Sequence, residues 1–155
     1  PGIRTLTAWC TATRYVTVSK STMPEQTRYA PDDPREWLVR ARSDLTPARS
    51  APSGVLLEDL CFHTQQAAEK AIKAVLILHD VEFPYVHELS RLLLLAEERG
   101  VAGAQGLLGV AALTRFAVSG RYPDRQPPPT REVYEEALVL AEAVVVWAES
   151  IVARS

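Results

Sequence analysis

The chain has 155 residues, 47% of them hydrophobic, and a formal net charge of -2 at neutral pH. This size and composition predict one domain with a single core, and the charge argues against a uniformly basic surface for nucleic acid. Cys10 and Cys61 do not make a disulfide framework or a zinc site, which fits a reducing cytosol. We expect no metal and no other cofactor. The sequence shows no membrane-spanning run and no signal-peptide pattern, which predicts a cytoplasmic protein.

The first 32 residues differ in composition from the rest of the chain. Residues 5–18 are rich in Thr, Val and aromatic side chains, which favours strand over helix. A polar segment with prolines follows and has the composition of a linker. Met23 lies at the junction, so residues 1–22 are either an extension upstream of the natural start or a real element. We divide the chain into an extension and linker at residues 1–32 and a helical domain at residues 33–155.

The first predicted helix has a clear start signal. Asp33 suits the N-cap, Pro34 suits the first helical position, and Glu36 stands three residues after the cap, as in a capping box. Pro47 and the following SAPSG segment are expected to end this helix. The next helix is expected over residues 55–79.

Three further helices are predicted. One covers residues 87–99, with Gly100 as the stop, and another covers residues 105–118, closed by Gly120. The last follows Thr130, which suits its N-cap. Short connections favour antiparallel neighbours. The predicted fold is therefore all-α, an up-and-down bundle of four to five helices.

The second predicted helix has two contrasting faces. Small alanines share one arc, which predicts close packing against other helices. The opposite arc contains His63, Gln66, Glu69, Lys70 and Lys73. This arc is either a solvated face, with Glu69 and Lys73 as a surface pair contributing about 0.2–0.5 kcal/mol, or a working surface. Phe62 and Ile77 fall in the same arc, which favours cover by a second subunit.

Several separated segments give the chain a resemblance to the HEPN domain. They are PREWLVRARSDL at residues 34–45, CFHTQQAAEKAIKAVL at residues 61–76, His87-Glu88-Leu89, and GRYPD at residues 120–124. The resemblance covers roughly residues 33–153 and implies a helical bundle, usually a homodimer. For bacterial members it also implies a small nucleotidyltransferase as the partner in a toxin–antitoxin pair.

Many HEPN proteins are metal-independent ribonucleases, and the resemblance implies where such an active site should lie. The family motif is an Arg followed after four to six residues by a His, which acts as acid or base while the Arg holds the phosphate. Arg115 and Arg121 occur in the expected segment, but no His follows either, because His87 is the last His of the chain. A Tyr-x-Tyr motif, which the partner modifies in other members, is also missing, since only Tyr122 is present.

The sequence therefore predicts a HEPN-type protein that binds nucleotide or RNA phosphates. The candidate phosphate and base contacts are Arg115, Arg121, Tyr122, Lys70, Lys73 and His63. Two alternatives stay open: an endoribonuclease with an unconventional acid–base residue such as His63, and a non-catalytic dimer that docks a partner. His87 is expected at a helix N-terminus, where a neutral imidazole bonded to nearby backbone is favoured.

Overall fold

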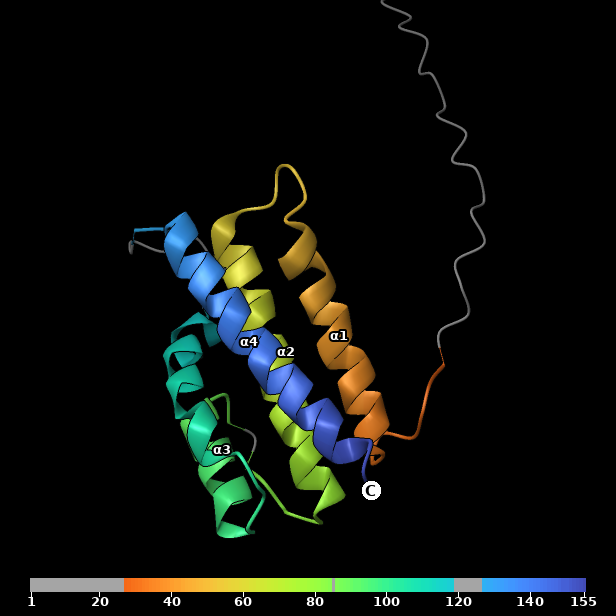
Figure 1. Cartoon of the computed structure of the whole chain (residues 1–155). Coiled ribbons are helices and arrows are strands. Elements are labelled where there is room, and N and C mark those ends of the chain that lie inside the picture. The colour runs from red at the N-terminus through yellow and green to blue at the C-terminus, as the bar shows by residue number, and fades with distance from the viewer. Residues whose placement is uncertain (1–26, 85, 119–126) are drawn as a thin grey trace, which may run out of the picture.

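The computed structural model describes residues 27–84, 86–118 and 127–155. In these ranges the chain forms α1 (Pro34–Ser50), α2 (Leu57–Leu78), α3 (Leu89–Glu98), the 3-10 helix η1 (Gln105–Ala117) and α4 (Arg131–Val152) (Figure 1). No strand occurs in the described ranges, so the predicted all-α fold is confirmed. The strand-like residues 5–18 and Met23 lie outside the described residues.

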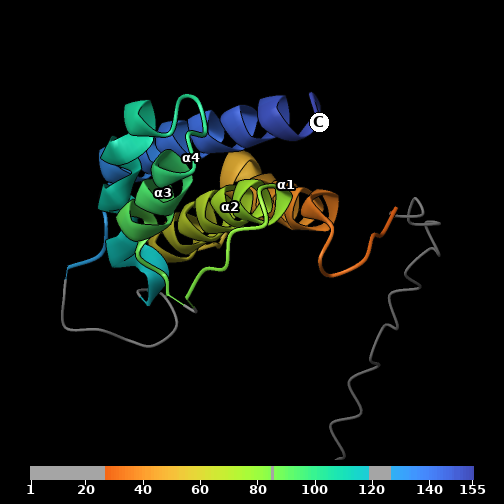
Figure 2. The ribbon, with the colours of Figure 1, turned by 90° about the horizontal axis from the view of Figure 1, so that it is seen from below.

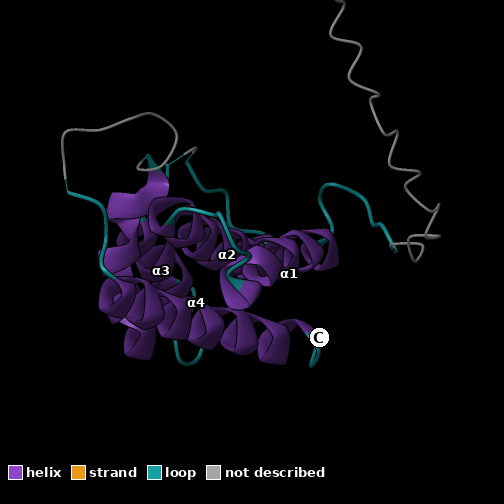
Figure 3. Cartoon of the chain, turned by 90° about the horizontal axis from the view of Figure 1, so that it is seen from above, coloured by secondary structure: helices purple, strands orange, loops and turns teal. Residues whose placement is uncertain are grey.

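Helix α2 occupies the centre of the bundle, and every other helix packs against it. Helices α1 and α4 also contact each other, while α3 and η1 cover a further flank of α2 (Figures 2 and 3). The predicted alanine arc of α2 is buried, with Ala67, Ala68, Ala71 and Ala74 all at 0% exposure. Small side chains at these positions let the neighbouring helices approach closely.

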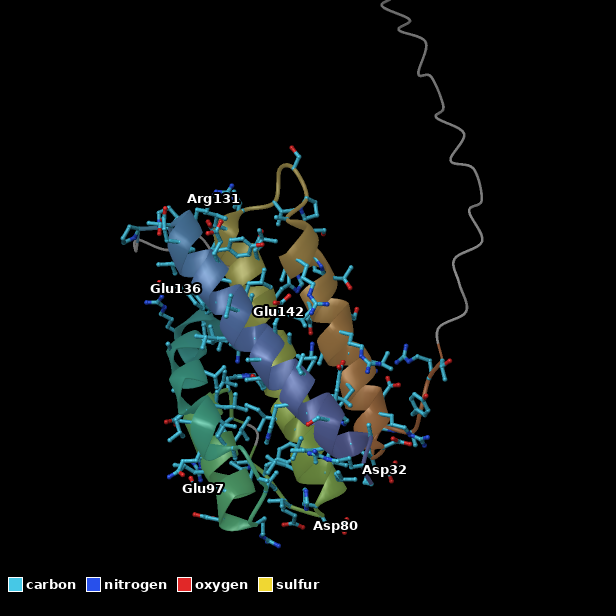
Figure 4. All side chains as sticks on the ribbon, in the orientation of Figure 1. Asp32, Asp80, Glu97, Arg131, Glu136 and Glu142 are labelled. Atoms are coloured by element: carbon cyan, nitrogen blue, oxygen red, sulfur yellow. The ribbon has the colours of Figure 1, made fainter. Side chains whose placement is uncertain are left out.

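Two ion pairs join α1 to α4 at the surface. Arg49 Nε lies 2.6 Å from a carboxylate oxygen of Glu142, and Arg42 Nε lies 2.6 Å from one of Glu149. Glu142 is labelled on α4 in Figure 4. The two pairs follow opposite directions along the sequence, which shows that α1 and α4 are antiparallel.

Three of the predicted helix boundaries are confirmed. The Asp33 side chain accepts a hydrogen bond from the backbone N–H of Arg35 at 2.8 Å, and Thr130 accepts one from Val133 at 3.4 Å. Gly100 follows α3 with a φ of +72°, a left-handed conformation that glycine adopts without strain.

The first helix ends in the predicted SAPSG segment but not at Pro47. Helix α1 continues through Pro47 to Ser50, and Ala51 ends it in a left-handed conformation with a φ of 39°. The backbone N–H of Ala51 donates to the carbonyl of Pro47 at 3.0 Å. Proline lacks an N–H but keeps its carbonyl, so it can still accept the bond that closes the last turn.

The later helices also differ from their predicted form. Helix α3 begins at Leu89 instead of residue 87, and its first N–H donates to the hydroxyl of Thr114 at 3.2 Å. The segment predicted as a helix over residues 105–118 is a 3-10 helix, unusually long for this type. It contains Gly106 and Gly109, and glycine disfavours a regular α-helix.

The loop between α2 and α3 runs back along α2. Val81 is buried, and Phe83 and Val86 pack against the core. The loop brings His87 into contact with Glu69, nine residues before the end of α2. At a rise of 1.5 Å per residue, this point lies roughly 14 Å from the end of the helix. The apolar side chains of the loop thus hold it against the bundle, and His87 lies beside the middle of α2.

A buried carboxylate fastens the segment before α1. Glu36 is 3% exposed and accepts hydrogen bonds from the Arg28 guanidinium at 2.6 Å, the Tyr29 backbone N–H at 3.0 Å and Arg40 at 3.0 Å. These donors, Arg28 first, lower the pKa of Glu36 to about 2. The predicted capping box is not formed, because Glu36 binds this segment while the N–H of Asp33 donates to the carbonyl of Ala30.

Replacing Glu36 with Gln is expected to destabilise the protein in a pH-dependent way. The pKa is lowered by folding from 4.5 to about 2, so the ionised carboxylate stabilises the fold above pH 4.5 and loses this effect as the pH falls toward 2. The difference in urea midpoint between wild type and Glu36→Gln should shrink over this window. Glu98→Gln, at an exposed glutamate, is the control. A difference that is equal at pH 2 and pH 7 would contradict the assignment.

Candidate functional site

The polar arc predicted on α2 is not a solvated face along its whole length. Glu69 and Lys73 are 5% and 6% exposed, and Gln65 is fully buried. The interpretation of Glu69 and Lys73 as a surface pair is therefore wrong. Aromatic side chains of α1 and of the loop after α2 cover this end of the arc, whereas His63, Gln66 and Lys70 remain partly exposed.

Glu69 is the centre of a buried hydrogen-bond cluster. Its carboxylate accepts from Gln65 Nε2 at 2.7 Å and from Lys73 Nζ at 2.7 Å, both on α2, and His87 Nδ1 lies 3.0 Å away. Burial alone would raise the pKa of Glu69, but the hydrogen bonds from Lys73, Gln65 and His87 outweigh it and lower the pKa. The carboxylate is therefore ionised at neutral pH.

Lys73 is held by this cluster and by aromatic rings. Its ammonium lies 5.5 Å from the ring centre of Phe83 and 6.0 Å from that of Trp37. These two rings meet edge to face with their centres 6.2 Å apart. The ammonium thus has a carboxylate and two π faces around it, an arrangement that stabilises a desolvated cation.

His87 has a different environment from the one predicted. Its Nδ1 faces both oxygens of Glu69, at 3.0 and 3.2 Å, and its side chain is 54% exposed. The prediction of a backbone-bonded imidazole at the start of a helix is wrong, because His87 precedes α3 and meets α2 instead. The two residues are 18 apart in the sequence, so no local pattern could have paired them.

A second cluster joins α1 to α2. Asp44 of α1 forms an ion pair with Lys70, and its other oxygen lies 3.2 Å from His63 Nδ1. All three side chains are partly buried. The two clusters are linked because Gln66 Nε2 donates to Gln65 Oε1 at 2.7 Å. Sequence analysis missed Asp44, since its role depends on how α1 is paired with α2.

Arg115 lies near the end of η1 and is exposed. Its guanidinium stands over the ring of Phe116, 4.7 Å from the ring centre. The adjacent Thr114 bonds to Leu89, two residues after His87, so the segments that carry Arg115 and His87 are in contact. The other predicted contacts in this part of the sequence, Arg121 and Tyr122, lie outside the described residues.

Burial shapes the chemistry of Cys61, which lies on α2 and is fully enclosed. Burial raises the pKa of this thiol to about 11, with the positive charge of Arg115 acting in the opposite direction.

Within the described ranges, no group of three or more His, Cys, Asp or Glu side chains is placed to hold a metal ion. None of the helices described here is long and apolar enough to span a membrane.

Comparison with known proteins gives the family. The model of the HEPN domain family matches residues 34–151. The chain belongs to the HEPN domain family. This HEPN chain is similar to ST0689, an archaeal HEPN homologue, with 28% identity, a TM-score of 0.61 and coverage of 77% of this chain and 98% of the other. It is also similar to TT1696 from Thermus thermophilus, with 31% identity, a TM-score of 0.64 and coverage of 76% and 96%. No curated protein matches the chain.

Replacing Lys73 with Met should destabilise the HEPN domain strongly. Met keeps an apolar side chain of similar length but leaves the buried Glu69 carboxylate without the ammonium of Lys73. The loss is expected to lower the free energy of unfolding by about 3 kcal/mol. Lys70→Met removes a more exposed pair and should cost less than about 1 kcal/mol. Urea denaturation at pH 7 measures both. Equal and small losses in the two variants would show that the Glu69 cluster does not depend on Lys73.

Proposed function

We propose that this HEPN protein binds the phosphates of nucleotides or RNA and does not cut RNA through the family's Arg-x(4-6)-His motif. The observation that carries the proposal is the exposed Arg115 at the end of η1, followed in the sequence by Arg121 and Tyr122 with no later His. A guanidinium can hold a phosphate through two parallel hydrogen bonds, and a tyrosine ring can stack on a base. Without a His at the motif spacing, the family's acid–base group is missing.

The predicted basic residues differ in how well they support this proposal. Lys70 and Lys73 are paired with Asp44 and Glu69, and His63 also faces Asp44. Their contacts hold α1, α2 and the following loop together. The primary phosphate contacts that we propose are Arg115, which is exposed near the end of η1, and Arg121, which follows it in the sequence.

The proposal includes a protein partner. We infer a small nucleotidyltransferase, acting with this chain in the cytoplasm as a toxin–antitoxin-like pair, and the support is the membership of the HEPN family. A nucleotidyltransferase reading frame beside the gene, and co-purification of its product with this chain, would support the pair.

Single-stranded RNA is expected to bind wild type weakly and with marked salt dependence. Arg115→Ala and Arg121→Ala should each weaken binding about tenfold, because each removes a charged hydrogen-bond donor, and should reduce the salt slope by about 0.7. Both effects can be measured by fluorescence anisotropy with a labelled five-nucleotide RNA. Titrations at about 50 and about 200 mM salt give the affinity and its dependence on salt. Arg154→Ala, at the exposed C-terminal end of the chain, is the matched control.

The same samples separate the alternatives. Reproducible cleavage of the RNA that disappears in His63→Ala would replace the binding proposal with the endoribonuclease. Binding that neither Arg115→Ala nor Arg121→Ala changes would instead favour the non-catalytic docking dimer.

We also propose that the protein is a homodimer. HEPN domains often dimerise, and α4 carries two widely exposed valines, Val139 at 65% and Val146 at 60%, seven residues apart on one side of the helix. Phe62 and Ile77, the other apolar candidates, are already half-buried within one chain.

Light scattering should give about twice the chain mass of 17.1 kDa. Val146→Glu should shift the protein to a monomer if α4 forms the interface, and a wild-type monomer at tens of micromolar would contradict the dimer.

A further inference from the structure

We propose that His87 is an additional phosphate contact of this protein, held by the buried Glu69 so that its Nε2 meets the ligand only when the imidazole is protonated. This inference rests on the proposed function and extends it. It adds a proton-linked residue from the loop before α3, outside the segment of Arg115 and Arg121, and it predicts that phosphate binding depends on pH.

The geometry fixes which nitrogen of His87 is available. Glu69 is ionised and can only accept, so Nδ1 carries a proton and donates to it. Glu69 cannot easily turn away, because Gln65 and Lys73 also bond to its oxygens. The imidazole is thereby oriented, and Nε2 is the nitrogen that remains.

Nε2 is open to a ligand. The His87 side chain is 54% exposed, and the hydrogen bonds of its ring within the described residues are made by Nδ1. A neutral imidazole in this tautomer offers a lone pair at Nε2, which repels a phosphate oxygen. A protonated imidazole offers a positively charged N–H at Nε2, while its Nδ1 still donates to the Glu69 carboxylate.

The surrounding charges decide what protonation of His87 changes. On α2, Lys73 already balances the charge of Glu69, so a proton on His87 adds a net positive charge near the surface. At the start of α3, Glu88 is adjacent, and its carboxylate accepts from Ser90 at 3.0 Å. From η1 comes Arg115, next to the Thr114 that bonds to Leu89. From α1 the cluster meets Trp37, an uncharged ring.

A phosphate is the anion that fits this position. His87 and Arg115 come from two segments in contact, so one nucleotide chain can reach both, with a bidentate guanidinium at one phosphate and a single imidazolium N–H at another. Glu88 opposes binding, so the imidazolium charge is needed to offset it. His87 thus contributes to phosphate binding only when it is protonated, whereas Arg115 contributes throughout.

The test is RNA binding as a function of pH. A rhodamine-labelled five-nucleotide RNA is titrated into the full chain between pH 5.5 and 8, a range that brackets the ordinary histidine pKa. Wild-type affinity should fall about tenfold across this range, as expected when binding takes up one proton. His87→Gln, which keeps a polar side chain but does not titrate, should bind at pH 5.5 as weakly as wild type does at pH 8 and should show no dependence on pH.

A control variant tests whether the effect belongs to His87. His79→Gln removes an exposed imidazole at the end of α2, so this variant should keep the pH dependence of wild type. The NMR signals of the His87 ring in wild type give an independent measurement, because the midpoint of their pH titration should rise when RNA is added.

The outcomes distinguish the inference from the function on which it rests. Binding that Arg115→Ala weakens but pH does not affect would overturn the role of His87 and leave the phosphate-binding function intact. A pH dependence that persists in His87→Gln, or a His87 midpoint that RNA does not move, would also overturn it. RNA binding at no pH would overturn both.

Discussion

The ionised carboxylate of Glu69 inside the bundle is the constraint on which the candidate site depends. A buried charge of this kind is costly unless donors surround it. Gln65 and Lys73 supply two donors from the same helix, and His87 supplies the third from a loop. The third contact is the important one for the fold, because it ties the loop after α2 to the middle of that helix.

The position of that loop sets the geometry of everything after it. Because His87 is held at Glu69, α3 begins two residues later, and its first N–H meets Thr114 of η1. Arg115 therefore reaches the surface near the segment that carries His87. The core side chains of the loop and the polar cluster act together here, since the apolar contacts bring the loop back and the hydrogen bonds select its register.

Three cations of the described residues neutralise carboxylates within the fold. Lys70 of α2 pairs with Asp44 of α1, Lys73 pairs with Glu69 on α2 itself, and Arg28 pairs with Glu36 at the start of α1. Arg115 lies exposed near the end of η1. The pattern of basic residues along one helix face does not predict these pairs, because they depend on where the tertiary structure places the carboxylates.

The sequence by itself determined the helical class, the caps at Asp33 and Thr130, the stop at Gly100 and the buried alanine arc of α2, because these depend on local periodicity and on residues within a few positions. It also determined that no His follows Arg115 or Arg121, whatever the fold. Only the tertiary structure decided that Glu69 is buried and that His87 is its partner. A helical wheel gives the direction of a side chain, but burial depends on the segments that cover it, and these are brought there by contacts between residues far apart in the chain.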